Sequence, residues 1–314
     1  ARPLATPASR SKRVTNPSPK GPPAPRTARE VLDRSHRFLE QRGLDGARRE
    51  AELLVANAIG LDRLGLYLAL DRPLVKAELD DAREAVLRRS KGEPAAYILG
   101  HREFYGRSFA VRPGVLIPRP ETELLVDRAR ELVEDLIVDG KDEPRLADLG
   151  TGSGCIAITM LLECPTTRVL ALDLSPDAVE VAGENAKALE VPTDRFGLRC
   201  GDAFEGLVAL APEGVDLLLS NPPYIDPRVG GELAGDVRAH EPALALFSPD
   251  GDPDHWARRL MQERERLLAP GGRALVELGF DQAPRLEALA AANGLEVRIH
   301  PDLEGIPRLL EFGR

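Results

Sequence analysis

Three glycines alternate with small polar residues in the stretch Asp148-Leu149-Gly150-Thr151-Gly152-Ser153-Gly154. A strand-like segment precedes this stretch and a helical segment follows it. Glycine lets the backbone approach a ligand closely, and the first turn of a helix presents N–H groups to negative charge. The spacing Gly-x-Gly-x-Gly differs from the Gly-x-Gly-x-x-Gly fingerprint of dinucleotide-binding folds. We therefore predict a ligand site at the end of a strand, and we do not expect a nicotinamide or flavin ligand.

Strand and helix patterns alternate from Glu121 onward, as in a parallel sheet covered by helices. We predict a doubly wound, mostly parallel α/β fold. Five parallel strands are expected near 145–149, 168–174, 197–200, 215–220 and 273–278. Helices should fill the intervals, such as 176–189 with Ser175 as N-cap and Pro176 at the first helical position. Two more strand segments, 295–300 and 309–312, have no helix between them, so they should form an antiparallel hairpin at the sheet edge.

A different pattern precedes the sheet. Thr27 and Glu30 stand at capping-box spacing before an amphipathic stretch, and helical periodicity continues through 51–59 and 79–87. Residues 27–91 are therefore predicted to form a small helical domain. Short β-like pieces at 97–99 and 109–111 alternate with glycines, which predicts a β-hairpin linker over 92–120. The sheet domain would then occupy 121–314.

The first 29 residues carry seven Lys or Arg, seven prolines and no acidic residue. Because the whole chain has a net charge of −9, removing these seven positive charges leaves −16 on residues 30–314. We expect a disordered basic tail over 1–26. An organelle-targeting peptide is the alternative, although seven prolines disfavour the amphipathic helix that such peptides use.

Composition also limits the partners. The acidic body argues against direct nucleic-acid binding, which depends on Lys and Arg charge. No apolar run reaches the length of a membrane span, so we expect no membrane partner. Three scattered cysteines and five scattered histidines predict a cytoplasmic, reducing location and no metal site.

A second motif, Asn221-Pro222-Pro223-Tyr224, follows the apolar run 215–220. Proline has no backbone N–H, so the two prolines end the strand and leave the carbonyls of Asn221 and Pro222 without ladder partners. With the side chain of Asn221, they form a rigid set of acceptors at the lip of the sheet. An ordinary proline turn is the alternative interpretation of Asn-Pro alone. The acceptor interpretation predicts a substrate with an NH2 group.

Asp173 ends the second strand, where an acid in a doubly wound fold accepts the ribose hydroxyls of an adenosine ligand. The glycine turn, Asp173 and Asn221 would thus meet at one sheet edge. This combination resembles class I S-adenosylmethionine-dependent methyltransferases, Rossmann-like enzymes with a seven-stranded sheet, over about the last two thirds of the chain.

That resemblance implies a division of the cofactor site. The methionine portion would be held by Gly150, Thr151, Gly152, Ser153 and Gly154, the ribose by Asp173, and the adenine by Asp202 with Ala203; Asn221 would lie beside the transferred methyl group. The chain departs from the family where some members carry a large aromatic residue after the adenine acid. Ala203 cannot stack on adenine, so either Phe204 replaces the aromatic residue or stacking contributes less.

More discriminating motifs occur at Tyr97-Ile98-Leu99-Gly100, Glu103-Phe104-Tyr105-Gly106, Leu116-Ile117-Pro118-Arg119-Pro120-Glu121-Thr122-Glu123 and Glu241-Pro242. With the helical domain, they resemble the release factor glutamine N5-methyltransferases, the PrmC/HemK family, over about residues 28–314. The resemblance implies methyl transfer from S-adenosylmethionine to the glutamine side chain in the Gly-Gly-Gln loop of class 1 peptide chain release factors. It also implies that the helical domain recognises the substrate.

The same resemblance assigns the acceptor residues. Asn221 and Pro222 would accept the N–H bonds of the glutamine amide, Pro223 would line the same site, and Tyr224 would pack against the flat amide. Arg119, Glu121 and Thr122 would either form a salt-bridged linker or help to close the site.

Three alternatives stay open from the sequence. Asn-Pro-Pro-Tyr would serve a flipped adenine in a nucleic-acid N6-methyltransferase equally well. Another translation protein could supply the glutamine. A non-catalytic adaptor that kept the fold is the third alternative, although the intact glycine turn, Asp173 and Asn221 argue against it.

Overall fold

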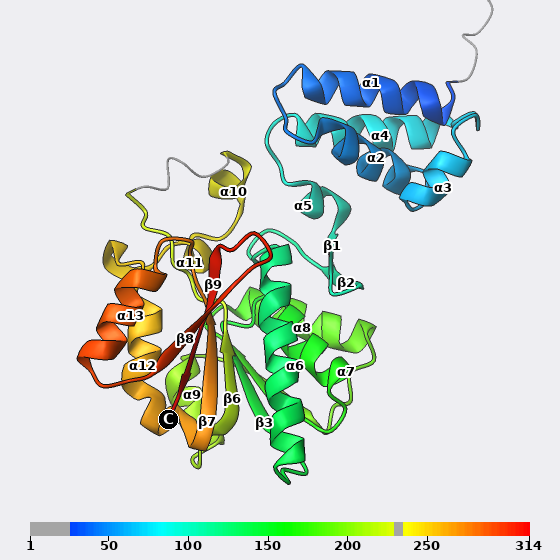
Figure 1. Ribbon diagram of the computed structural model, residues 1–314. Coiled ribbons are helices and arrows are strands. Elements are labelled where there is room, and N and C mark those ends of the chain that lie inside the picture. Colours follow the sequence, from blue (N-terminus) through cyan, green and yellow to red (C-terminus); the bar gives the residue numbers. More distant parts are fainter. Residues whose placement is uncertain (1–25, 229–234) are drawn as a thin grey trace, which may run out of the picture.

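The computed structural model describes residues 26–228 and 235–314, so residues 1–25 of the predicted tail lie outside the described part. The N-terminal helices are α1 (Ala28–Glu40), α2 (Ala47–Ala58), α3 (Arg63–Leu68), α4 (Lys76–Arg89) and α5 (Ala95–Leu99). Thr27 caps α1 as predicted, because its Oγ1 accepts a hydrogen bond from the Glu30 backbone N–H at 3.3 Å. These helices pack around their own apolar core and form a body beside the sheet domain (Figure 1).

One prediction in the linker is wrong. Residues 97–99 belong to α5, not to a β-like piece. Pro94 precedes this helix, and Gly100 ends it in the left-handed conformation with φ 79°. Ile98 and Leu99 pack against the core of the helical domain, so tertiary packing overrides the strand preference of Tyr and Ile.

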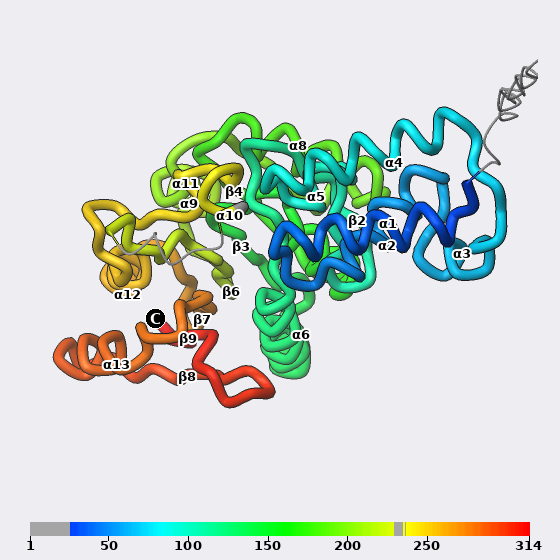
Figure 2. The backbone as a smooth tube through the Cα atoms, turned by 90° about the horizontal axis from the view of Figure 1, so that it is seen from above, coloured from blue at the N-terminus to red at the C-terminus, as the bar shows by residue number. Residues whose placement is uncertain are grey.

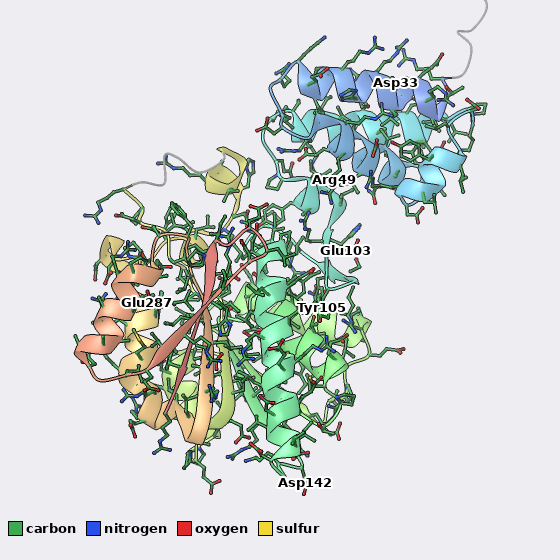
Figure 3. All side chains as sticks on the ribbon, in the orientation of Figure 1. Asp33, Arg49, Glu103, Tyr105, Asp142 and Glu287 are labelled. Carbon is green, nitrogen blue, oxygen red and sulfur yellow. The ribbon has the colours of Figure 1, made fainter. Side chains whose placement is uncertain are left out.

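The hairpin itself is present, with strands β1 (His101–Phe104) and β2 (Arg107–Ala110) paired antiparallel. Tyr105 and Gly106 form its two-residue turn with φ 51° and 70°. Phe104 and Phe109 are fully buried in the core of the sheet domain. Tyr105, labelled in Figure 3, donates its hydroxyl to Asp127 on α6 (Glu123–Val138) at 2.7 Å. The hairpin is therefore docked on the sheet domain.

The sheet has seven strands in the order β5-β4-β3-β6-β7-β9-β8. The strands are β3 (Arg145–Leu149), β4 (Arg168–Asp173), β5 (Phe196–Cys200), β6 (Val215–Ser220), β7 (Leu268–Glu277), β8 (Val297–Pro301) and β9 (Pro307–Gly313). The first five are parallel, while β9 runs antiparallel to β7 and β8 antiparallel to β9. This confirms the predicted parallel strands and the antiparallel pair at the edge. Strand β7 begins five residues before the predicted start at 273, because a register irregularity opposite β6 carries the strand through Pro270-Gly271-Gly272.

Helices cover both faces of the sheet (Figures 1 and 2). On one face lie α6 (Glu123–Val138), which follows the short helix η1 (Pro120–Thr122), with α7 (Cys155–Glu163) and α8 (Pro176–Ala188). On the other lie α9 (Ala203–Leu210), α12 (His255–Leu267) and α13 (Ala283–Ala292). Between β6 and α12 the described chain forms α10 (Gly235–His240), α11 (Ala243–Leu246) and η3 (Pro249–Gly251). The strand order reverses beside β3, which places a ligand crevice at the carboxyl ends of β3, β4 and β6.

Candidate active site

The glycine turn after β3 is held by backbone contacts to β4. The N–H groups of Gly150 and Thr151 both donate to the Leu172 carbonyl, at 2.9 and 3.0 Å. The Gly152 N–H donates to Oδ2 of Asp173 at 2.8 Å. Gly150 and Gly152 have φ of 77° and 56°, and a Cβ added at either would meet nothing within 4 Å. The turn therefore requires residues that adopt the left-handed backbone conformation, and the space beside Gly150 and Gly152 is open.

Gly154 serves a different purpose. It is the N-cap of α7 with φ 80°, and an added Cβ would lie 2.8 Å from Cδ1 of Ile158 and 3.2 Å from Cβ of Ala182. It also does not line the cavity described below. Gly154 therefore allows α7 and α8 to pack closely, and the structure does not bring it to the ligand space.

The carboxylate of Asp148 supports the glycine turn through hydrogen bonds. Its Oδ2 accepts from Oγ1 of Thr151 at 2.6 Å and from the Ala157 N–H at 3.2 Å. Burial raises the pKa of Asp148 to about 7. Within residues 26–228 and 235–314, its Oδ1 has no hydrogen-bond partner. Asp148 is fully buried and does not line the cavity described below, so it supports the turn and does not reach the ligand space.

The two predicted cofactor acids stand at neighbouring strand ends. Asp173 accepts from the Gly152 N–H through Oδ2 and from the Ser175 N–H through Oδ1 at 2.9 Å. Burial raises its pKa above the ordinary value. Asp202 is the N-cap of α9, and its Oδ1 accepts from the N–H groups of Phe204 and Glu205, which leaves Oδ2 available. Both carboxylates thus have fixed orientations before any ligand binds.

A cavity of about 360 Å³ lies at this edge and joins the predicted residues. Its size is that of a small-molecule site. The predicted residues that line it are Gly150, Thr151, Gly152, Ser153, Asp173, Asp202, Ala203, Asn221, Pro222 and Pro223, together with Arg119 and Thr122 of the linker, whereas Gly154, Glu121 and Tyr224 do not. Lining residues that the sequence interpretation did not name include Val115, Ile156, Leu174, Leu244, Trp256 and Leu260.

The wall near Ala203 is aromatic. Phe204 is almost completely buried and stacks on Trp256 with an interplanar angle of 23°, while the Arg259 guanidinium lies 3.8 Å from the centre of the Phe204 ring. Phe204 and Trp256 both line the cavity, and the indole Nε1 of Trp256 is buried with no partner in the described residues. A lone tryptophan in a helix carries no local signal of this role, so the sequence could not have identified it.

The acceptor motif begins where β6 ends. The Nδ2 group of Asn221 donates to Oγ1 of Thr122 at 3.1 Å, and that hydroxyl donates to Oε2 of Glu277 at 2.6 Å. Within the described residues, no group donates to the side-chain oxygen of Asn221 or to the Pro222 carbonyl. Two acceptors therefore remain available at the cavity.

Tyr224, the last residue of the motif, does not line the cavity. Its hydroxyl is 3.4 Å from Oε1 of Glu277, and its ring packs beside Gly279, where an added Cβ would lie 3.2 Å from Cδ2. Burial raises the pKa of the Tyr224 phenol, so the hydroxyl stays protonated. Tyr224 is close to the site, but its packing against an acceptor amide stays a prediction.

The three linker residues have separate positions. The Arg119 guanidinium donates to Oε1 of Glu241 at 2.6 Å, and Glu241 also accepts from the Ile117 N–H at 3.1 Å. Glu241 is buried, so this pair fastens the linker to the segment that follows the acceptor motif. Thr122 is buried beside Asn221, whereas Glu121 is exposed.

No cluster of three or more His, Cys, Asp or Glu side chains in the described residues has the arrangement of a metal site. Among the described helices, none has the length and apolar character to cross a membrane.

Comparisons with known proteins identify two regions. The PrmC N-terminal domain family matches residues 30–100, and the methyltransferase small domain family matches residues 123–236. A release factor glutamine methyltransferase of Chlorobaculum tepidum is 40% identical over 280 residues, which are 89% of this chain and 94% of the relative. One of Cereibacter sphaeroides is 43% identical over 269 residues, 85% of this chain and 91% of the relative.

The hMettl16 catalytic domain is similar in fold alone, with a TM-score of 0.52 and 16% identity over 75% of this chain and 80% of that one. A sheet of this order with a glycine turn facing a strand-end acid defines a class I S-adenosylmethionine-dependent methyltransferase. Because its relatives are similar over nearly their whole length, the chain belongs to the release factor glutamine methyltransferase family. It is thus a protein-glutamine methyltransferase that uses S-adenosylmethionine.

Proposed function

We propose that this enzyme methylates the side-chain nitrogen N5 of the glutamine in the Gly-Gly-Gln loop of class 1 peptide chain release factors. The observation that carries the proposal is the pair of available acceptors, the Asn221 side-chain oxygen and the Pro222 carbonyl, beside the cofactor cavity. A primary amide has two N–H bonds, which two acceptors satisfy. The names of the relatives support the release factor as the protein that carries this amide.

The residues of the cavity suit the methyl donor. The open side of the glycine turn offers close backbone approach, and Asp173 is fixed so that its carboxylate can accept ribose hydroxyls. Asp202 and the aromatic wall formed by Phe204 and Trp256 support an adenine ring at this end of the cavity, in place of an aromatic residue at Ala203. When bound, S-adenosylmethionine supplies an electrophilic methyl group on a positively charged sulfur.

Positioning is the main catalytic task of the acceptor residues. An amide nitrogen is a poor nucleophile because its lone pair is delocalised into the carbonyl group. Two fixed acceptors align that nitrogen and place negative potential around it as positive charge develops. The methylated nitrogen then loses its extra proton readily, so we assign no general base. Pro223 lines the same wall, and we keep Tyr224 as a residue that restrains the amide plane.

We assign substrate recognition to the helical domain. Its five helices form a separate body joined to the sheet domain by the docked hairpin. Release factors are large compared with the cavity, so a second surface must select the protein that presents the glutamine.

The test is to incubate the enzyme with S-adenosylmethionine and a class 1 release factor and to map the product by peptide mass spectrometry. We expect one added methyl on the Gly-Gly-Gln glutamine. Asn221→Ala should lower the rate by about 100-fold, by analogy with the loss of one fixed hydrogen-bonding group at a reacting centre. Asn293→Ala, which changes an exposed asparagine on the far side of the sheet domain, is the control and should have no effect.

Two outcomes would contradict the proposal. Methylation of DNA or RNA adenine, with an unmodified release factor, would favour the nucleic-acid alternative. Absence of cofactor binding in calorimetry would favour an adaptor.

A further inference from the structure

A buried chain of polar side chains reaches the acceptor motif from two remote elements. Thr122 comes from the end of η1, and Glu277 is the last residue of β7. Thr122 is 2% and Glu277 is 3% exposed. Thr122 was predicted only as part of a linker or of a segment that closes the site, and Glu277 was not predicted to have a role. Because Ser220 of β6 pairs with Val276 of β7, the next residues along both strands, Asn221 and Glu277, emerge side by side at the carboxyl edge.

The direction of each hydrogen bond follows from chemistry. An ionised carboxylate can only accept, and a hydroxyl has a single proton to donate. Since Thr122 lies 2.6 Å from Glu277, its proton is used there. The Thr122 oxygen can then only accept from its other neighbour, 3.1 Å away, and the NH2 group of Asn221 is the end of that amide that can donate. The carbonyl end of Asn221 is consequently left for the cavity.

This orientation matters because the two ends of an amide have nearly the same shape. If Asn221 were turned over, it would present NH2 to the NH2 of the acceptor glutamine, and two donors would face each other. Shape alone cannot prevent that inversion, whereas a neighbour that only accepts can.

We propose that Thr122 and Glu277 are positioning residues that hold the Asn221 amide with its oxygen toward the acceptor nitrogen. The proposal rests on the proposed function, since it assumes that the acceptor is a primary amide. Glu277 accepts the proton of the Thr122 hydroxyl, and Thr122 can then only accept a hydrogen bond from the NH2 group of Asn221.

A protonated Glu277 would weaken this control, because it could donate to Thr122 and let Thr122 donate to Asn221. Besides Thr122, the described groups around Glu277 are the hydroxyl of Tyr224 at 3.4 Å, the buried thiol of Cys155 on α7, and the more distant charges of Glu121 and Arg308. Burial is the largest influence and raises the pKa of Glu277 to about 7; the Thr122 hydrogen bond opposes this. The correct orientation is therefore favoured at pH above about 7 and lost as pH falls below it.

The first test compares Thr122→Val with Thr122→Ser. Valine keeps the shape but leaves the Asn221 NH2 facing a methyl group, and an unsatisfied buried donor should reduce kcat/KM for the release factor about tenfold. Serine keeps the hydroxyl and should restore most of the activity. Affinity for S-adenosylmethionine should stay within about twofold in both variants, since neither change touches the ribose or adenine contacts.

Thr159→Val is the matched control. Thr159 is completely buried in α7, and its hydroxyl has no partner among the described residues. The same substitution there should leave kcat/KM unchanged. Equal activity of Thr122→Val and the wild type, or equal losses for Thr122→Val and Thr122→Ser, would overturn the proposal.

The second test uses the pH profile. In the wild type, kcat/KM should fall on the acidic side with a midpoint near pH 7. Glu277→Gln cannot ionise and, like the protonated acid, can donate as well as accept, so this variant should show at every pH the reduced kcat/KM that the wild type has at low pH, without an acidic limb. Persistence of the same limb in Glu277→Gln would contradict a role for Glu277 in orienting the amide.

A readout without catalysis separates this inference from the proposed function. The chain has five asparagines, so selective ¹⁵N labelling gives few side-chain amide signals, and the Asn221 pair is the one absent in Asn221→Ala. That pair should shift in Thr122→Val and remain near its wild-type position in Thr122→Ser. Unmethylated release factor with these shifts observed would reject only the proposed function, whereas unchanged shifts in Thr122→Val would reject the orienting chain.

Discussion

The two halves of the site are held in different ways. In the cofactor half, the backbone of the glycine turn is bonded to Asp173, only 21 residues from Gly152. In the acceptor half, Asn221 is bonded to Thr122, 99 residues away, and Tyr224 reaches Glu277 across 53 residues. A turn held by neighbouring main chain depends on few side chains, whereas the acceptor half depends on side chains that only the folded sheet brings together. Substitutions in one half of the site should therefore change properties that substitutions in the other half leave unaltered.

The largest effect is expected at Gly154. An alanine there would combine left-handed strain with contacts of 2.8 Å to Ile158 and 3.2 Å to Ala182, a loss of about 3 kcal/mol in the free energy of unfolding. Gly150→Ala, in open space at φ 77°, should suffer only the backbone strain of about 1 kcal/mol. Urea unfolding of the cofactor-free protein measures both, and equal losses would show that packing of α7 on α8 is not the reason for Gly154.

Asp173→Ala tests the cofactor half directly. The change removes the acceptor for the Gly152 and Ser175 N–H groups and, in the proposed function, for the ribose, so binding of S-adenosylmethionine should weaken by about 2 kcal/mol, or roughly 30-fold. Calorimetry measures this against Asp194→Ala, an exposed carboxylate before β5 at the opposite end of the sheet. Similar affinity in the two variants would remove Asp173 from the ribose site.

The buried carboxylate of the acceptor half should be visible in stability. Burial raises the pKa of Glu277 to about 7, so between its ordinary value and pH 7 the folded state holds a proton that the unfolded state has lost. That contribution to stability is present at low pH and declines as pH rises, by about 1 kcal/mol from pH 6 to pH 8. Comparing urea unfolding of Glu277→Gln and the wild type at both pH values isolates it, and parallel pH slopes would argue against a raised pKa.

The smallest effect is expected for Gly279→Ala. The new methyl group would lie 3.2 Å from the Tyr224 ring, so the ring must shift by a few tenths of an ångström. We expect kcat to fall by about threefold, because small misplacements near a reacting group carry modest costs, with unchanged affinity for S-adenosylmethionine. Gly183→Ala, where the added Cβ meets Leu198 at an ordinary 3.6 Å, is the control. An unaltered kcat would mean that the position of Tyr224 is unimportant.

Sequence patterns predicted much of the fold because its signals are local. The strands 145–149 and 215–220 match β3 and β6 residue for residue, and Ser175 caps α8 as expected. The failure at 97–99 and the late start assigned to β7 have a common cause. In both, the contacts of the folded protein outweighed the preference of the local residues.

For the site, the glycine turn, Asp173 and Asn221 could be predicted from their places at or just after strand ends, since parallel strands end at one edge, and Asp202 from the family resemblance; all of them line the one cavity. Trp256 and Glu277 could not, because a tryptophan within a helix and a glutamate at a strand end have no distinctive local pattern. Thr122 was noted in its motif, but its partners were not predictable.

From the amino-acid sequence alone came the parallel sheet, the glycine turn, the acid Asp173 at a strand end and the rigid motif Asn221-Pro222-Pro223-Tyr224, because each depends on residues adjacent in the chain. Only the tertiary structure decided which way the Asn221 amide faces and which aromatic residues line the cavity beside Ala203. The physical reason is that the Asn221 amide is oriented by Thr122, and Thr122 is in turn oriented by Glu277. These three residues come from separate elements that meet only at the sheet edge of the folded protein.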